Sequence, residues 1–551
     1  MKTEWYKDIV FYQIWPRSFS DGNDDGIGDL HGVYNKLEYL KELGIGGIWF
    51  SPLYVSPNAD YGYDIADYRD ISPDYGDLET FKKVLDKAHS LGIKVIMDLV
   101  VNHTSDEHEW FQQSRDKDSK YRDYYIWRKG RSKNRPPNNW DGLFEADAWQ
   151  FDEKSGEYYL HLFLRKQADL NMDNPVVREE VKDIMRFWLD MGVDGFREDV
   201  ITFISKKEGL PNGISPVLKG LNQYNNGPHL HEYLNEFRRD VLDKYDSFVI
   251  GEAPMMTPKK ALKLISEESE RPLDAMFHFQ NMSADCIFTE YVPRPFNLRK
   301  LKRSFSRWQK GLYGKGWNAL YLENHDHPRI ISRYGNEKYR VQSGKMLAVS
   351  FLFQQGTPFI YQGQEIGMTN IALDSIDKYK DCVAINRYNN GIKKKSKEEM
   401  LALIQHASRD SARTPVQWSD DANGGFSSVE PWFTVNPNYP EVNVQSQEND
   451  PDSLLNFYRA ILKYRNGNPI IRHGTYNEYN KCSSDLFIYS REHEGKKLLI
   501  ICSFTEKSVT FKTPRGFDLD KATLVFFNYD NAEIKDNKFV TKPYEARVYE
   551  V

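Results

Sequence analysis

Short apolar runs alternate with longer amphipathic segments along most of the chain. The segment before the second run, for example, places Leu37, Leu40 and Leu43 at helical spacing. Repeated strand–helix units of this kind predict a parallel sheet, and eight of them predict an α/β fold, a (β/α)8 TIM barrel. The eight predicted strands are 9–14, 47–51, 93–99, 193–197, 248–251, 275–278, 319–322 and 357–361.

Two intervals in this pattern are much longer than a βα unit. A complete βαβ unit takes roughly 30 residues, whereas the third and fourth strands are separated by a long segment rich in Trp, Tyr, Asn and charge. We expect an inserted subdomain B there, at 104–173. A second polar insertion, at about 367–450, follows the eighth strand, and we expect it to overhang the same face of the barrel.

From about residue 475 the apolar runs become closely spaced and lose their intervening helices. This change predicts a C-terminal all-β sandwich domain. The expected division is a catalytic barrel in two parts, an inserted subdomain and a C-terminal β domain, at 1–103 and 174–474, 104–173 and 475–551, respectively.

Three carboxylates stand where apolar strand runs end: Asp199, Glu252 and Asp326. A barrel of parallel strands gathers its carboxyl ends on one face, where active sites are built. Any one of these acids, taken singly, is more simply explained as a salt bridge or a helix cap. Together, with Arg197 two residues before Asp199 and His325 beside Asp326, they favour cleavage of a glycosidic bond. Arg197 is expected to hold Asp199 ionised.

Composition indicates which binding partners and which cellular compartment suit the protein. The formal net charge is −6, which argues against a nucleic acid or an anionic membrane as partner. No run of about 18 apolar residues occurs, and the N-terminal residues lack the apolar stretch of a signal peptide. The four cysteines are widely spaced, without metal-ligand spacing. A cytoplasmic protein is therefore expected. We also expect a monomer, and the three acids predict a small oligosaccharide as its substrate.

Four motifs carry a family resemblance. They are Asp98-Leu99-Val100-Val101-Asn102-His103, Gly195-Phe196-Arg197-Glu198-Asp199-Val200, Gly251-Glu252 and Glu323-Asn324-His325-Asp326. In this order they resemble the four conserved regions of the alpha-amylase family, glycoside hydrolase family 13. The resemblance covers nearly the whole chain. It implies that Asp199 is the nucleophile, Glu252 the general acid/base and Asp326 the transition-state stabiliser of a retaining enzyme with a covalent intermediate.

Two further stretches resemble the oligo-1,6-glucosidase group of that family: Gln167-Ala168-Asp169-Leu170-Asn171, and the stretch from Arg409 to Trp418. The group's Pro is replaced by Ala168. The resemblance implies exo action on a terminal glucose, with Asp60 and Arg409 closing the pocket. The residues that it implies for substrate binding are Asp60, Tyr63, His103, Phe163, Gln167, Arg197, His325 and Arg409.

The residues on either side of the nucleophile affect the specificity. Val200 resembles the residue of enzymes that prefer α-1,6 links, whereas Thr or Ala there is typical of α-1,4 enzymes. Glu198 departs from the usual hydrophobic residue, and strand alternation predicts that it points away from the pocket. An α-1,4-glucosidase and a sucrose isomerase remain alternatives. The isomerases' Arg-Leu-Asp-Arg-Asp stretch is not found at 291–299.

A metal site is expected near the first strand. The stretch from Asp21 to Asp29 begins like a calcium loop but has Gly32 where an EF-hand has Glu. A polar turn rich in Asp and Gly is the alternative. The family resemblance includes a structural Ca²⁺ or Mg²⁺ here, with Asp21, Asn23, Asp25, Asp29 and the carbonyl of Ile27 as ligands.

Overall fold

The chain forms an eight-stranded parallel barrel with helices around it, seen in a computed structural model that describes residues 3–132, 135–268 and 270–551. Neighbouring strands follow the order β13-β12-β11-β5-β2-β1-β17-β16, and the outermost two, β13 and β16, lie in contact. The predicted TIM barrel is confirmed. Its strands are β1 (Phe11–Ile14), β2 (Gly47–Phe50), β5 (Lys94–Leu99), β11 (Gly195–Glu198), β12 (Phe248–Glu252), β13 (Ala275–Phe277), β16 (Ala319–Leu320) and β17 (Thr357–Tyr361).

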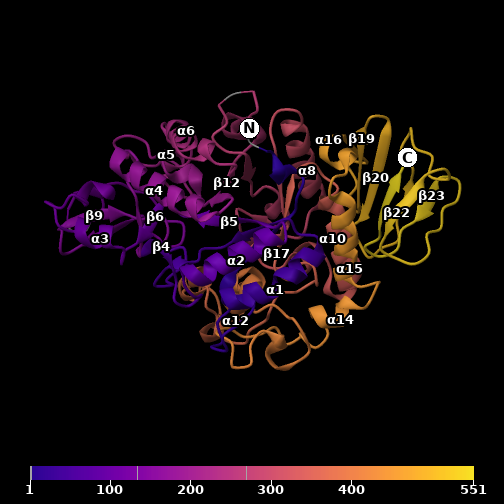
Figure 1. Cartoon of the computed structure of the whole chain (residues 1–551), viewed down its shortest axis with the longest axis horizontal. Coiled ribbons are helices and arrows are strands. Elements are labelled where there is room, and N and C mark those ends of the chain that lie inside the picture. The colour runs from indigo at the N-terminus through magenta and orange to yellow at the C-terminus, as the bar shows by residue number, and fades with distance from the viewer. Residues whose placement is uncertain (1–2, 133–134, 269) are drawn as a thin grey trace.

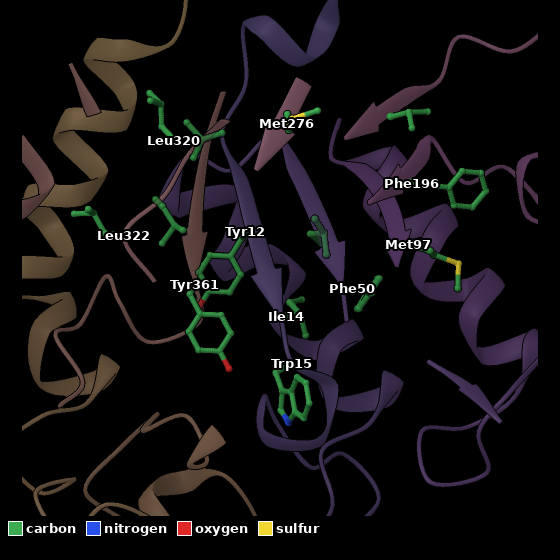
Figure 2. Packing of buried hydrophobic residues seen from close by; sticks show 14 of the residues in the cluster. Tyr12, Ile14, Trp15, Phe50, Met97, Phe196, Met276, Leu320, Leu322 and Tyr361 are labelled. Carbon is green, nitrogen blue, oxygen red and sulfur yellow. The ribbon is translucent and has the colours of Figure 1, made fainter. Parts of the chain in front are cut away.

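Side chains on alternate positions of these strands fill two different cores. Phe11 of β1 stacks on Phe248 of β12 at 5.5 Å between ring centroids, and Phe277 of β13 meets Phe359 of β17 at 4.7 Å. Contacts between non-neighbouring strands place these rings inside the barrel. Residues one position along, such as Tyr12, belong to the larger core shared with the helices (Figure 2). Burial on both faces explains why the strands read as continuous apolar runs.

Helices surround the barrel, and several begin where a polar side chain caps them. Asp29 accepts a hydrogen bond from the amide of Gly32, and Thr257 caps a helix whose first residue is Pro258. The helices of the barrel and of its connections are α1 (Leu30–Leu43), α2 (Leu78–Ser90), α4 (Pro175–Met191), α5 (Leu221–Tyr224), α6 (Leu230–Asp240), α7 (Pro258–Ile265), α8 (Leu298–Leu312), α9 (Ile330–Tyr334), α10 (Arg340–Leu352), α15 (Leu454–Arg465) and α16 (Pro469–His473).

Strand β16 is shorter than the sequence predicts. It pairs with β17 only at Ala319 and Leu320. Leu320 lies opposite Pro358, which has no amide hydrogen to donate, and the next carbonyl, of Tyr321, accepts a hydrogen bond from the side chain of Asn281 at 2.7 Å. Asp326 consequently lies in a loop six residues beyond the strand rather than at its end.

Two small sheets stand between β5 and α4, where an inserted subdomain is expected. One joins β6 (His103–Ser105) to β10 (Gln167–Asp169), and the other has three strands, β7 (Trp127–Arg128), β8 (Trp149–Asp152) and β9 (Glu157–Leu160). The short helix α3 (Glu109–Ser114) accompanies them. A buried ion pair at 2.7 Å between Asp169 of β10 and Lys206 ties this segment to the loop that follows β11.

The segment between β17 and α15 carries four α-helices and an apolar cluster of its own. The helices are α11 (Cys382–Gly391), α12 (Lys397–Ala407), α13 (Asp410–Arg413) and α14 (Val444–Glu448). Helix α12 lies against the hairpin of β14 (Cys286–Ile287) and β15 (Thr289–Pro293), which follows barrel strand β13. A second short hairpin, of β3 (Tyr54–Val55) and β4 (Asp67–Ile71), follows β2.

The C-terminal domain is an antiparallel β structure, as predicted, at the opposite end of the molecule from the inserted sheets (Figure 1). Phe487 and Tyr489 belong to the larger core that the barrel shares with its helices, whereas Leu486 and Ile488 pack with the smaller, two-stranded sheet. The main sheet has the order β18 (Thr475–Tyr479), β19 (Leu486–His493), β20 (Lys496–Ser503), β24 (Ala546–Glu550) and β22 (Thr523–Phe527), and the smaller one pairs β21 (Thr510–Lys512) with β23 (Lys538–Val540). Among the described residues, no helix combines the length and apolar character needed to span a membrane.

Candidate active site

A single buried guanidinium joins three carboxylates at the carboxyl ends of β5, β11 and β12. Arg197 donates from Nη1 to Asp98 at 2.7 Å and to Asp199 at 2.6 Å, and its Nη2 lies 2.7 Å from Oε1 of Glu252. The other oxygen of Glu252 accepts the amide hydrogen of Val200 at 3.1 Å. Two of the three predicted acids therefore share one partner.

The shared arginine does not keep these acids at their ordinary acidity. Burial raises the pKa of Asp199 to about 7, and the opposing effect of Arg197 is offset by the nearby charge of Asp98. Burial likewise raises the pKa of Glu252 to about 7. The expected ion pair between Arg197 and Asp199 is present, but its one positive charge serves three carboxylates and does not hold the pKa of Asp199 below its ordinary value. Near neutral pH the cluster can instead keep one acid protonated and the other ionised.

Asp326 is an acid of the opposite kind. Burial alone would raise the pKa of Asp326, but His325, Arg409 and Arg413 hold this pKa well below its usual range. His325 is neutral near pH 7, because burial lowers its pKa to about 4. Gln13 donates to its Nδ1 at 2.7 Å, so its Nε2 carries the proton and donates to Asp326 at 3.0 Å. Asp326 thus remains an acceptor.

Arg409 closes one end of the site. Its terminal nitrogens lie 3.1 Å from Asp60 and 3.1 Å from Asp326, and its Nε donates to Asp381 at 3.0 Å. The guanidinium also lies over the ring of Phe144 at 5.0 Å. The segment after β17 therefore reaches across the barrel mouth and connects it to the loop that carries Asp60, an arrangement that suits a blind pocket.

The remaining predicted binding residues lie beside this closed end. Tyr63 stacks on His325 at 5.2 Å with nearly parallel rings, and His103 donates to the carbonyl of Tyr63 at 3.1 Å. Gln167 donates to Asp60 at 3.2 Å, and Phe163 packs on His103 with ring centroids 5.0 Å apart. The structure thus brings together residues from barrel loops and from the inserted segment.

Several residues of the site were not among the predicted ones. Asp98 accepts hydrogen bonds from Tyr63 and Arg197, Asp381 anchors Arg409, and Arg413 lies 3.3 Å from Asp326. The first motif contains Asp98, and the stretch from Arg409 to Trp418 contains Arg413, so both had a local signal. Asp381 had none, because only the fold places it beneath Arg409.

The two neighbours of Asp199 face different surroundings. Val200 adopts a left-handed backbone with φ 35°, a strained conformation for a β-branched residue, and packs in one cluster with Phe163 and Phe203. Glu198 lies on the helix side of the strand, near Arg238 of α6 and Asp274, as alternation predicts. Burial raises the pKa of Glu198 to about 8, and its Oε2 has no hydrogen-bond partner among the described residues.

The predicted metal loop supplies hard oxygen donors. Their present partners, however, are mostly backbone amides: Asp21 accepts from the amides of Asn23 and Asp24, Asp25 from that of Ile27, and Asp29 from that of Gly32. Within the described residues, no three acidic, histidine or cysteine side chains are grouped to hold a metal. The donor types suit Ca²⁺ or Mg²⁺, and the metal site stays a prediction.

Comparison with known proteins defines the class to which this site belongs. Residues 13–474 match the family model described as "Alpha amylase, catalytic domain". The chain belongs to the alpha-amylase family of glycoside hydrolases. An oligo-1,6-glucosidase of Parageobacillus thermoglucosidasius is 47% identical, with each chain covered in full, and one of Bacillus cereus is 45% identical at the same coverage.

Solved structures of other specificities are also similar. A trehalose-6-phosphate hydrolase of Bacillus licheniformis superposes with a TM-score of 0.95 at 41% identity, and an isomaltulose synthase of Klebsiella sp. LX3 with 0.95 at 38%; both comparisons cover each chain in full. The overall fold therefore does not separate hydrolases from isomerases, and residues near the bond to be cleaved must do so.

Proposed function

We propose that this protein is a retaining, exo-acting α-glucosidase that cleaves α-1,6-glucosidic bonds at the non-reducing end of isomaltose and isomalto-oligosaccharides. The observation that carries this is the pairing of Asp199 and Glu252 on Arg197, beside an end closed by Arg409 and Asp60. The full-length likeness to oligo-1,6-glucosidases supports the linkage.

Each acid has a task that its surroundings suit. Glu252, whose pKa burial raises to about 7, donates a proton to the leaving oxygen, while ionised Asp199 attacks the anomeric carbon and forms a glycosyl-enzyme ester. Glu252 then removes a proton from water, whose oxygen attacks the anomeric carbon; the ester bond to Asp199 breaks, and glucose leaves with retained configuration. Asp326, kept ionised by its arginines, accepts hydrogen bonds from the sugar hydroxyls in the transition state.

The closed end explains why we propose exo action. Arg409, Asp60 and Gln167 are linked by direct contacts at 3.1 and 3.2 Å, so a sugar chain cannot continue past the terminal glucose on that side. A structural Ca²⁺ or Mg²⁺ in the loop from Asp21 to Asp29 and a monomeric, cytoplasmic protein belong to the same proposal.

A product assay on isomaltose, maltose, sucrose, trehalose 6-phosphate and dextran tests the proposed function. We expect release of glucose, first as the α-anomer, with isomaltose cleaved faster than maltose. Conversion of sucrose into isomaltulose or trehalulose would favour an isomerase instead. Preference for maltose would favour an α-1,4-glucosidase, and preference for trehalose 6-phosphate would favour that hydrolase.

A further inference from the structure

A cavity of about 870 Å³ lies outside the cluster of acids, between the loop that follows β11, the first turn of α6 and helix α7. Its volume is within the range of about 300–1,000 Å³ that is usual for sites of small ligands. Among its lining residues are Asn222, Asn225, Asn226, Met255, Lys260 and Lys263. None of the residues that close the glucose end contributes to it.

The cavity is close to the proton donor along two chain segments. Met255 follows Glu252 by three residues, which span at most about 11 Å when extended. Asn226 donates its backbone amide hydrogen to the carbonyl of Thr202 at 2.8 Å, and Thr202 is two residues beyond Val200, which itself contacts Glu252. The cavity therefore borders the two loops that begin at the proton donor and just after the nucleophile.

This position determines which part of a substrate can reach the cavity. The proton donor must face the oxygen of the leaving group, and the opposite end is closed by Arg409 and Asp60. A chain longer than a disaccharide must therefore leave past Glu252, along the loops that follow β11 and β12. Those two loops also line the cavity.

The lining has the chemistry that recognises sugars. Asn226 donates to the side chain of Asn225 at 2.8 Å, and the remaining amide groups of the three asparagines can donate to and accept from sugar hydroxyls. The lysine ammoniums add further donors. Met255 lines the cavity, exposes 52% of its surface and holds a left-handed backbone with φ 59°, a strained conformation for this residue. Apolar side chains of this kind can pack on the faces of sugar rings.

We propose that this cavity binds the reducing-end glucose residues of isomalto-oligosaccharides, beyond the residue next to the scissile bond. The proposal rests on the proposed function and extends it from a linkage to a chain length. Binding energy gained there is absent for a disaccharide, so longer chains have the higher kcat/KM.

The test compares kcat/KM for isomaltose, isomaltotriose and isomaltotetraose in the wild type and in the double variant Asn222→Ala/Lys260→Ala. Both side chains are exposed, so the fold should tolerate the change. We expect the ratio of isomaltotetraose to isomaltose to exceed one in the wild type and to fall about five- to tenfold in the variant. Activity on 4-nitrophenyl α-glucoside, which has no leaving-group sugar, should not change.

Lys259→Ala is the matched control, because Lys259 is exposed on the same turn of α7 but does not line the cavity. An unchanged ratio in the double variant, or an equal loss in the control, would overturn the proposal. If isomaltose is not cleaved at all, the proposed linkage is wrong, and the same comparison with malto-oligosaccharides then tests the cavity separately.

Discussion

Replacing Glu198 by Met should make the protein more resistant to alkaline pH. Glu198 is 1% exposed, and its Oε2 has no hydrogen-bond partner among the described residues. The nearby Arg238 is already engaged with both oxygens of Asp274, at 3.3 and 2.5 Å. Burial therefore dominates and raises the pKa of Glu198 from 4.5 to about 8.

The sign of the effect follows from linkage. The carboxyl is neutral in the folded protein and ionised in the unfolded chain over this range, so stability is fully present below pH 4.5 and is lost as pH rises towards 8. At about 1.36 kcal/mol for each unit of pH, the loss is about 3 kcal/mol at pH 7 and about 5 kcal/mol above pH 8. Met has a similar length and no charge, so it avoids this loss.

Thermal unfolding at matched scan rates between pH 5 and pH 9 measures the effect. With an unfolding entropy of about 2.1 cal/mol/K for each residue, 3 kcal/mol corresponds to a gain in Tm of about 3 °C at pH 7, against less than about 1 °C at pH 5. Glu198→Gln is the control: it should also remove the pH dependence, with a smaller gain because its amide lacks partners. If the Tm of Glu198→Met falls with pH as steeply as that of the wild type, Glu198 is not the group responsible.

Four other predictions concern the site and the metal loop. Asp199→Asn should reduce glucose release by a factor of at least about 10⁴ while Tm is retained; substantial residual turnover would remove Asp199 from the role of nucleophile. The kcat/KM should fall below about pH 7 as Asp199 is protonated and above it as Glu252 loses its proton; a flat profile from pH 5 to pH 9 would contradict these roles. Val200→Thr should raise the ratio of maltose to isomaltose cleavage, and an unchanged ratio would show that Val200 only packs. EDTA should lower Tm in the wild type but not in Asp25→Ala, and an equal response in both would exclude this loop as the metal site.

Much of the barrel could be predicted because its signal is local. Each strand is an apolar run buried on both faces, and in each helical segment apolar residues recur about every 3.6 residues. All eight strands were therefore predicted at or near their positions. The strand before Asp326 was predicted too long, because a proline on β17 and the side chain of Asn281 end its pairing. Neither partner is near it in the sequence.

In the active site, too, some features follow from local sequence and others from contacts between distant segments. The order of residues along the chain is enough to place each acid after its strand, since residues in one motif are neighbours in the chain. Folding brings one guanidinium into contact with Asp98, Asp199 and Glu252, and Asp381 into contact with Arg409, and no local pattern in the sequence predicts either contact. The pKa of a buried acid depends on burial and on every charge within a few ångströms. Those charges come from segments hundreds of residues apart, so a local motif can identify an acid but cannot determine its protonation state.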